Sequence, residues 1–380
     1  MSTLLTVENL SKVYTLGGGL FGPARELVAL NDVGFTLEAG ETLAIVGESG
    51  CGKTTLGRCI IKAQPVTHGH VYYHPRDQAK VELTALGKRD IKPWRRDIRM
   101  IFQDPMSSLN PNMRVFDIVA EPLRIHRVAR GKELEERVLD TLAKVGIAPD
   151  AVGRYPHAFS GGQRQRIGIA RALVLDPRLV IADEAVSALD VSIQAQVLNL
   201  LDDLKSEFGL TYIFISHDLG VVNYIADRVL VMYLGHVVEN APTEMLFERP
   251  RHPYTEMLLE ALPIADPTRR KGRSKELKGE IPYLGNRPRG CPFHTRCKYA
   301  QDICRSEKPA LRSINGSAQM AACHFAETLD LKGAYESSIG GGDRPLPLEG
   351  GGGGGRGWFC DPRCTPTLIP SPQGGGRRRS

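Results

Sequence analysis

Short apolar runs alternate with longer amphipathic patterns over roughly the first 240 residues of the chain. The runs at 42–46, 99–102, 179–182 and 211–216 have the length of buried strands, and helix-like spacing fills the segments between them. This alternation is typical of an α/β domain with a mainly parallel sheet. It predicts one such domain over residues 1–240.

One stretch inside this domain, residues 104–159, contains no β-rich run. Its apolar residues Leu134, Val138, Leu142 and Val145 recur with the period of a helix. We therefore expect a helical subdomain over residues 104–159, inserted into the sheet domain.

The rest of the chain divides into three segments of different composition. A Pro-punctuated connecting segment covers residues 241–278, and a small Cys-containing extension follows at 279–330. Residues 331–380 form a low-complexity tail with consecutive glycines at 350–355. Such a composition cannot bury enough apolar surface to offset the entropy of ordering, so we expect the tail to be disordered.

Composition and charge narrow the class of protein. The 380 residues are 42% hydrophobic and 24% charged, which suits a globular protein with a sizeable core. The net charge of +6 comes from interleaved charges, a pattern that argues against a nucleic-acid-binding surface. No apolar stretch approaches the roughly 20 residues of a membrane-spanning helix, and the N-terminal pattern is unlike a signal peptide. We expect a cytoplasmic protein.

A phosphate-binding motif, G-x-x-x-x-G-K-[ST], follows the apolar run that ends at Val46. Its glycines let successive N–H groups point at phosphates, its lysine reaches the β and γ phosphates, and its hydroxyl offers a ligand to Mg²⁺. A glycine-rich turn without a ligand is the alternative. The nucleotide-binding residues predicted here are Gly47, Glu48, Ser49, Gly50, Cys51, Gly52, Lys53, Thr54 and Thr55, with Thr54 at the metal.

Two acidic residues follow the apolar run at 179–182. We expect Asp183 to hold Mg²⁺ and Glu184 to polarise the water that attacks the γ phosphate. Taken alone, two acids after a strand are more often solvated side chains. A phosphate-binding motif in the same chain favours the catalytic interpretation.

The segment at 159–166, FSGGQRQR, resembles the signature sequence of ABC ATPases. Further elements follow in the order of that family: Gln103 after the run at 99–102, Ser187–Asp190 after Glu184, and His217 after the run at 211–216. Each of these polar residues, taken singly, has a loop-capping role as its alternative. The resemblance implies a P-loop NTPase fold and a head-to-tail dimer with two ATP molecules between its subunits.

The resemblance also implies roles for individual residues. The ATP of the opposite subunit is bound by the signature turn, Ser160, Gly161, Gly162 and Gln163, and Asp190 makes a contact across the dimer. Gln103 senses Mg²⁺ and the attacking water, and His217 hydrogen-bonds to the γ phosphate. Tyr14 stacks on adenine. Tyr14 has a core or surface position as its alternative. Ala185 stands where the family usually has Pro, and we expect activity to survive this difference.

Two further segments, at 248–263 and 290–297, resemble the ATPase subunits of oligopeptide, dipeptide and nickel importers. The first contains the run His-Pro-Tyr-Thr, for which the sequence suggests only a turn. The resemblance covers residues 1 to about 325. It implies an ATPase at the cytoplasmic face of the bacterial inner membrane. The implied partners are a second, identical or homologous ATPase, two membrane permease subunits and an extracytoplasmic solute-binding protein.

Four cysteines lie close together in the extension: Cys291, Cys297, Cys304 and Cys323. Four thiolates can hold a four-iron four-sulfur cluster or a tetrahedral zinc ion. The gaps are longer than those of zinc ribbons, and the resemblance implies the iron–sulfur cluster, which we favour. Zinc, a mixed site with His294 or His324, and unligated thiols are the alternatives. We interpret Cys360 and Cys364 in the tail as incidental.

Together these patterns predict an ATPase that couples hydrolysis to the import of oligopeptides or dipeptides, with another solute such as nickel as an alternative. A soluble ABC ATPase acting on nucleic acid or ribosomes is disfavoured, because the chain has one set of motifs and no heptad run. A subunit that binds ATP without hydrolysing it is disfavoured because Glu184, Gln103 and His217 are all in place.

Overall fold

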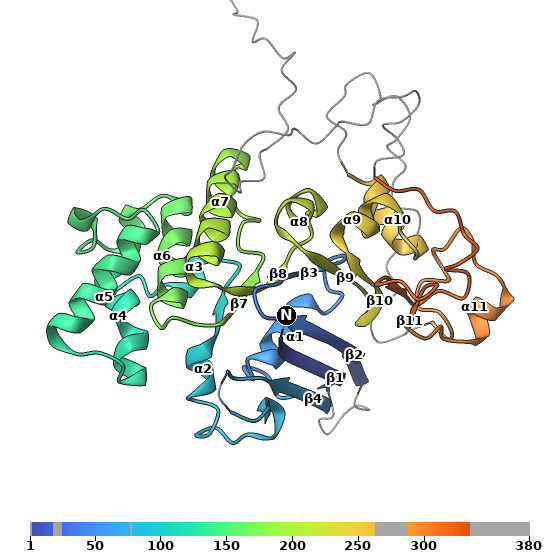
Figure 1. Cartoon of the computed structure of the whole chain (residues 1–380), viewed down its shortest axis with the longest axis horizontal. Coiled ribbons are helices and arrows are strands. Elements are labelled where there is room, and N and C mark those ends of the chain that lie inside the picture. Colours follow the sequence, from blue (N-terminus) through green and yellow to red (C-terminus); the bar gives the residue numbers. More distant parts are fainter. Residues whose placement is uncertain (1, 18–24, 77, 263–287, 335–380) are drawn as a thin grey trace, which may run out of the picture. The chain divides into compact units, whose positions relative to one another are not determined.

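The computed structural model describes residues 2–17, 25–76, 78–262 and 288–334 (Figure 1). Of the predicted tail, residues 335–380 lie outside the described part, together with Cys360 and Cys364. The second half of the predicted connecting segment, 263–278, and residues 279–287 of the extension also lie outside it.

An eight-stranded sheet forms the centre of the described structure, in the order β11-β12-β10-β9-β3-β8-β7-β6. The strands from β9 to β6 run parallel to their neighbours, whereas β10, β12 and β11 add antiparallel pairs. The mainly parallel α/β fold predicted from the sequence is therefore confirmed. The strands are β3 (Thr42–Val46), β6 (Ile98–Ile101), β7 (Leu179–Asp183), β8 (Thr211–Ile215), β9 (Arg228–Tyr233), β10 (His236–Pro242), β11 (Arg312–Ser313) and β12 (Met320–Ala321).

The central strands are mainly apolar because both faces of the sheet are covered. Along β3, Leu43 and Ile45 pack on the same side as helix α1 (Lys53–Ile60), while Ala44 and Val46 pack against α8 (Leu219–Ile225) and α9 (Thr243–Glu248). This is the alternation of side chains expected along a strand. It explains why the runs read as continuous apolar segments in the sequence.

A second, antiparallel sheet in the order β2-β1-β4-β5 packs on the other side of α1 (Figure 1). The sequence analysis did not predict this sheet. Its strands are β1 (Thr3–Leu16), β2 (Arg25–Glu38), β4 (His68–Tyr73) and β5 (Val81–Glu82), and a short 3-10 helix (Leu83–Ala85) follows. Because α1 lies between two apolar surfaces, the helix that follows the phosphate loop is held firmly in place.

Helices gather beside the β6 edge of the sheet, where Figure 1 shows them at the left. The segment predicted as a helical insertion, residues 104–159, contains α3, α4 and α5, and α6 packs against the same apolar cluster. The bounds are α2 (Trp94–Asp97), α3 (Pro105–Ser108), α4 (Val115–His126), α5 (Gly131–Lys144), α6 (Gly161–Leu173) and α7 (Val191–Phe208), with 3-10 turns at Pro149–Ala151 and Pro156–Ala158.

The extension packs on the β10 side of the sheet, where β12 pairs with β10 and one buried carboxylate contacts several segments. Glu239 on β10 accepts hydrogen bonds from the Thr255 hydroxyl at 2.6 Å and from the Gln319 side chain at 2.8 Å. It also accepts from the backbone N–H groups of Arg251 and His252. Burial raises the pKa of Glu239 to about 7. This residue therefore joins β10, α10 (Pro253–Glu260) and the extension, which carries α11 (Asp302–Ser306).

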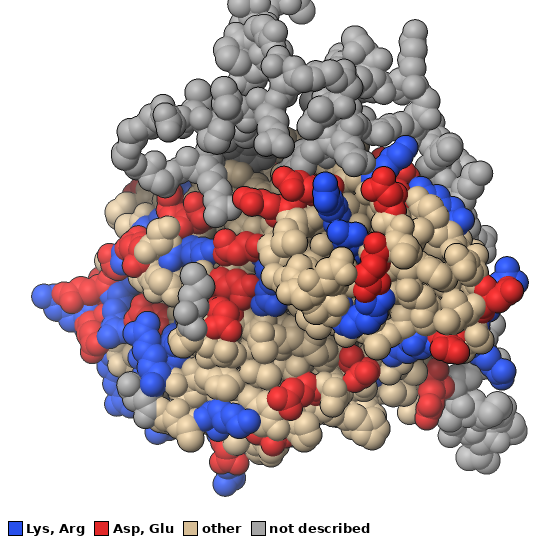
Figure 2. Space-filling view, turned by 45° about the vertical axis from the view of Figure 1, so that its right-hand side comes forward, with Lys and Arg blue, Asp and Glu red and all other residues tan. Residues whose placement is uncertain are grey.

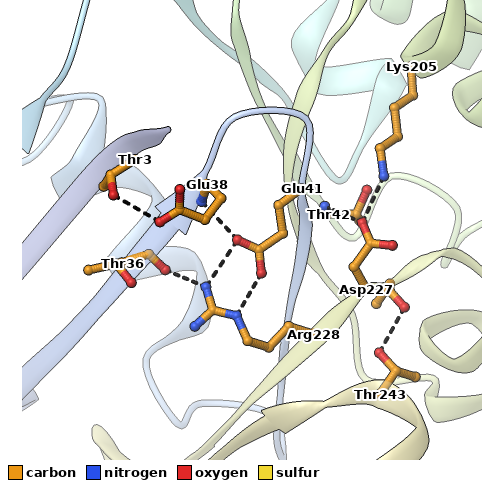
Figure 3. A network of polar contacts seen from close by, with 10 residues as sticks. Thr3, Thr36, Glu38, Glu41, Thr42, Lys205, Asp227, Arg228 and Thr243 are labelled. Carbon is orange, nitrogen blue, oxygen red and sulfur yellow. Dashed lines mark hydrogen bonds and ion pairs between the residues drawn. The ribbon is translucent and has the colours of Figure 1, made fainter. Parts of the chain in front are cut away.

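The amino ends of β3 and β9 are tied to the small sheet by a polar network (Figure 3). Arg228 donates to both oxygens of Glu41, at 2.6 and 3.1 Å, and also to the carbonyl of Thr36 on β2. Asp227 accepts from the Thr42 N–H and from Lys205, both at 2.8 Å. This network lies at the end of β3 opposite the phosphate loop.

Charged side chains of both signs are interspersed over the face in Figure 2. None of the described helices is long and apolar enough to cross a membrane.

Candidate functional site

The phosphate loop joins the end of β3 to the start of α1, and two of its glycines have no room for a side chain. A Cβ on Gly47 would lie 2.2 Å from the carbonyl oxygen of Met232, and one on Gly52 would lie 2.6 Å from that of Ala29. Both have positive φ, 148° and 106°. The turn therefore needs glycine at both positions, whereas Ser49 is exposed and Thr55 half-buried.

Lys53 and Thr54 point back into this loop from the start of α1. The Lys53 ammonium donates to the carbonyls of Gly47 at 2.7 Å and Glu48 at 3.1 Å, and its side chain is buried. The Thr54 hydroxyl donates to Asp183 at 2.9 Å. Burial raises the pKa of Asp183, and the hydrogen bond from Thr54 opposes that shift. An adjacent hydroxyl and carboxylate are oxygen ligands of the kind that Mg²⁺ prefers.

Glu184 brings the other predicted catalytic residues together. Its carboxylate accepts a hydrogen bond from the Gln103 amide at 2.8 Å, and the His217 ring nitrogen Nδ1 lies 3.4 Å from its other oxygen. The Glu184 N–H donates to the carbonyl of Ile215 at the end of β8, and its φ of 46° is unusual for a residue with a side chain. Such a backbone conformation is common where a side chain must be aimed at a site.

The signature turn lies at the start of α6, in the helical part of the molecule (Figure 1). Ser160 caps the helix: its hydroxyl accepts from the Gln163 N–H, and the Gln163 side chain accepts from the Ser160 N–H. A Cβ on Gly162 would meet Ile193 of α7 at 2.4 Å. Ser160, Gly161 and Gln163 are exposed, as is Asp190 before α7. None of the contacts described for this turn reaches the phosphate loop of the same chain.

Tyr14 lies on β1, and its surroundings limit its freedom. Its hydroxyl donates to Gln64, and the Lys12 ammonium lies 4.8 Å from the centroid of its ring. The ring is half-buried.

The four cysteines of the extension line one cavity, together with His294 and His324. Three of them, Cys291, Cys304 and Cys323, are buried, and Cys297 is half-buried. Burial raises the pKa of Cys291, Cys297 and Cys323 to about 11, so the free thiols stay protonated. Among the described residues, no group of three or more ligand side chains has the geometry to hold a metal ion.

The His-Pro-Tyr-Thr run acquires a physical explanation in the structure. The ring of His252 caps α10 by accepting from the Tyr254 N–H at 3.1 Å, and Pro253 occupies the first turn, where no N–H is needed. The Tyr254 hydroxyl accepts from the Glu48 N–H in the phosphate loop at 2.8 Å. Thr255 bonds to Glu239. Burial lowers the pKa of His252 to about 3, so it caps the helix as a neutral ring.

The sequence analysis assigned no role to Tyr254 or to Arg296, although both contact the phosphate loop. The Arg296 guanidinium donates to both carboxylate oxygens of Glu48. The two segments that carry these residues resemble the peptide-importer ATPases. That resemblance was the only signal in the sequence that could have drawn attention to Tyr254 and Arg296.

The chain is similar to known proteins in sequence and in structure. Residues 30–187 match the family model described as ABC transporter, and residues 238–304 match the model described as oligopeptide/dipeptide transporter, C-terminal region. The dipeptide transport ATP-binding protein of Escherichia coli is 49% identical, covering 84% of this chain and 93% of its own length. The oligopeptide transport ATP-binding protein AppF of Bacillus subtilis is 47% identical, covering 85% of this chain and 97% of its own length.

A solved dimer of an ATP-binding cassette, bound to ADP and phosphate after hydrolysis, aligns with a TM-score of 0.56. It is 29% identical and covers 63% of this chain and 99% of its own length. These likenesses confirm the family resemblance. The chain belongs to the ATP-binding proteins of ABC transporters, in the branch of the oligopeptide and dipeptide transport ATPases.

Proposed function

We propose that this chain is the ATPase subunit that energises an importer of oligopeptides or dipeptides from the cytoplasmic face of the membrane. The observation that carries the proposal is the convergence of Gln103 and His217 on the Glu184 carboxylate, beside the Thr54–Asp183 pair. The Glu184 carboxylate, which can accept a proton, thus lies at the same edge of the sheet as Thr54 and Asp183, whose oxygens can bind a cation. That arrangement suits an in-line attack of water on a phosphate.

In this proposal the phosphate loop cradles the nucleotide, Lys53 binds the β and γ phosphates, and Tyr14 stacks on adenine. Thr54, Asp183 and Gln103 would hold Mg²⁺, which when bound offsets phosphate charge. Glu184 polarises the attacking water and His217 donates to the γ phosphate, so the protein supplies positioning and charge stabilisation. The exposure of Ser160, Gly161, Gln163 and Asp190 supports their use in contacts with a second subunit.

The names of the relatives support a complex with membrane partners. We propose two permease subunits, a second ATPase and an extracytoplasmic solute-binding protein.

The experiment is to reconstitute these components in lipid vesicles and to measure ATP hydrolysis with a panel of di- to pentapeptides. The rate of ATP hydrolysis should be higher with peptide-loaded solute-binding protein than with the same protein free of peptide. Stimulation by nickel and not by any peptide would overturn the peptide assignment while leaving the ATPase in place.

We also propose that the cavity lined by the four cysteines holds a four-iron four-sulfur cluster, with zinc as the alternative. The observation that supports this is that the four cysteines line one cavity, in a segment with a small apolar core of its own. A bound cluster supplies positive charge that would favour the thiolate forms. The role that we propose is to hold the extension together.

Anaerobically purified protein should contain iron and acid-labile sulfide in near-equal amounts, and the Cys291→Ser variant should lose both. The matched control is Cys59→Ser, because Cys59 is also a buried free thiol, and burial raises its pKa to about 11 as well, but it lies in α1. That variant should keep its iron. Zinc in place of iron, or no metal in the wild type, would contradict the iron–sulfur assignment.

A further inference from the structure

The extension contacts the phosphate loop through a buried ion pair. The Arg296 guanidinium donates to Glu48 from Nη1 to Oε2 at 2.7 Å and from Nη2 to Oε1 at 2.9 Å. The side chains are 2% and 12% exposed. Glu48 is the second residue of the phosphate loop, so this bidentate contact links the Cys-containing extension to the nucleotide site.

The backbone of Glu48 is fixed on both sides as well. Its N–H donates to the Tyr254 hydroxyl at 2.8 Å, and its carbonyl accepts from the Lys53 ammonium at 3.1 Å. Lys53 is the residue assigned to the phosphates. The position of Glu48 therefore affects the group that binds the nucleotide.

Arg296 itself contacts two aromatic side chains, and a third ring packs against both of them. Its guanidinium carbon lies 5.8 Å from the ring centroid of Tyr233 on β9 and 5.9 Å from that of Phe293 in the extension. The ring centroid of Tyr254 lies 4.7 Å from that of Tyr233 and 5.4 Å from that of Phe293. These three rings are buried, so Arg296 has little freedom to follow a movement of the loop.

The charges of Glu48 and Arg296 connect this ion pair to nucleotide binding. The loop must receive a polyphosphate, and an unpaired carboxylate at Glu48 would repel it, since like charges at short range in a partly buried site interact strongly. The guanidinium of Arg296 neutralises that carboxylate. The bidentate geometry also fixes its direction.

We propose that Arg296 is a positioning residue for ATP: it neutralises Glu48 and, with Tyr254, holds the phosphate loop in the geometry that binds phosphate. This inference rests on the proposed ATPase function of the same site.

The test is an Arg296→Ala variant of the full chain, assayed for MgATP hydrolysis and for equilibrium binding of a fluorescent ATP analogue. Removing one partner of a buried charge pair should raise KM by about tenfold and weaken binding of the analogue to match. The kcat should change by less than about threefold, because the contacts described for Arg296 include none with Glu184, Gln103 or His217.

Two further variants separate the effect of the Arg296 charge from the effect of its bidentate geometry. The double variant Glu48→Gln with Arg296→Ala removes both charges, and its KM should return most of the way to the wild-type value. Arg296→Lys keeps the charge without the fork and should give an intermediate KM. Both remain informative if Arg296→Ala does not fold.

The matched control is Arg228→Ala, because Arg228 forms a second bidentate pair, with Glu41 at the opposite end of β3 (Figure 3), whose side chains are 20% and 11% exposed. It should lower stability and leave KM unchanged. An unchanged KM in Arg296→Ala, or an equal rise in Arg228→Ala, would overturn the inference. Wild-type protein without ATPase activity would instead refute the proposed function, and the binding assay would still test Arg296.

Discussion

Replacing Glu184 with Gln should reduce steady-state ATP hydrolysis by about 10²- to 10⁴-fold, the range expected for loss of a general base. Gln has nearly the shape of Glu, so the contacts with Gln103 and His217 can be largely kept while the negative charge is lost. MgATP binding should survive, because Lys53 and the phosphate loop are untouched. The subunits should then remain closed around unhydrolysed ATP. Phosphate release and size-exclusion chromatography with labelled ATP measure the two effects.

The chain offers a matched control for this substitution. Glu82 also pairs with a histidine, through His70 Nδ1 at 2.7 Å, but in the small antiparallel sheet. The Glu82→Gln variant should hydrolyse ATP at the wild-type rate. If Glu184→Gln hydrolysed ATP as fast as the wild type, Glu184 would not be the base, and the convergence of Gln103 and His217 on it would need another explanation.

The sequence was enough to predict that the polar residues of the site lie close together, because the carboxyl ends of the strands in a parallel sheet lie on the same side. The phosphate loop, Gln103, the pair Asp183 and Glu184, and His217 each lie at or just after the carboxyl end of a different strand. Those ends meet at one edge of the sheet. Strand position along the chain was therefore enough to bring them together. The hydrogen bonds from Gln103 and Thr54 to the two acids agree with that expectation.

The small antiparallel sheet was harder to predict from the sequence. The pairing of β1 with β2 shifts register at several points, and residues such as Asn9 and Asp32 have positive φ there. Irregularities of this kind interrupt the simple alternation by which strands are recognised. The sheet is nevertheless essential to the fold, because it covers the side of α1 that faces away from the main sheet.

The contacts of the extension with the phosphate loop could not be predicted from local pattern at all. Arg296 and Glu48 are separated by 248 positions, and neither lies in a periodic segment that would reveal its partner. The same holds for Tyr254, whose hydroxyl reaches the loop from α10. The resemblance to the importer ATPases singled out both segments in the sequence. Only the tertiary contacts explain why Tyr254 and Arg296 stand at these positions.

Replacing Lys53 with Ala should weaken MgATP binding by at least about a hundredfold, which corresponds to the loss of two charge-assisted hydrogen bonds of about 1.5 kcal/mol each. In the structure the ammonium satisfies the carbonyls of Gly47 and Glu48, and it is the loop's own positive charge for a polyphosphate. Binding of a fluorescent ATP analogue gives the dissociation constant. Thermal unfolding with and without MgATP gives an independent measure, since a ligand that binds weakly no longer raises the Tm.

Loss of carbonyl contacts alone could destabilise the protein, and Lys62→Ala controls for this. The Lys62 ammonium also donates to backbone carbonyls, those of Thr84 at 2.9 Å and Leu83 at 3.2 Å, but Lys62 lies just beyond the carboxyl end of α1. That variant should unfold at a lower temperature and bind MgATP with the wild-type affinity. Equal loss of affinity in the two variants would mean that stability, not phosphate contact, explains the effect of Lys53. A loss confined to Lys53→Ala would place the phosphates at this lysine, whose ammonium contacts the carbonyl of Glu48, the residue that Arg296 and Tyr254 hold.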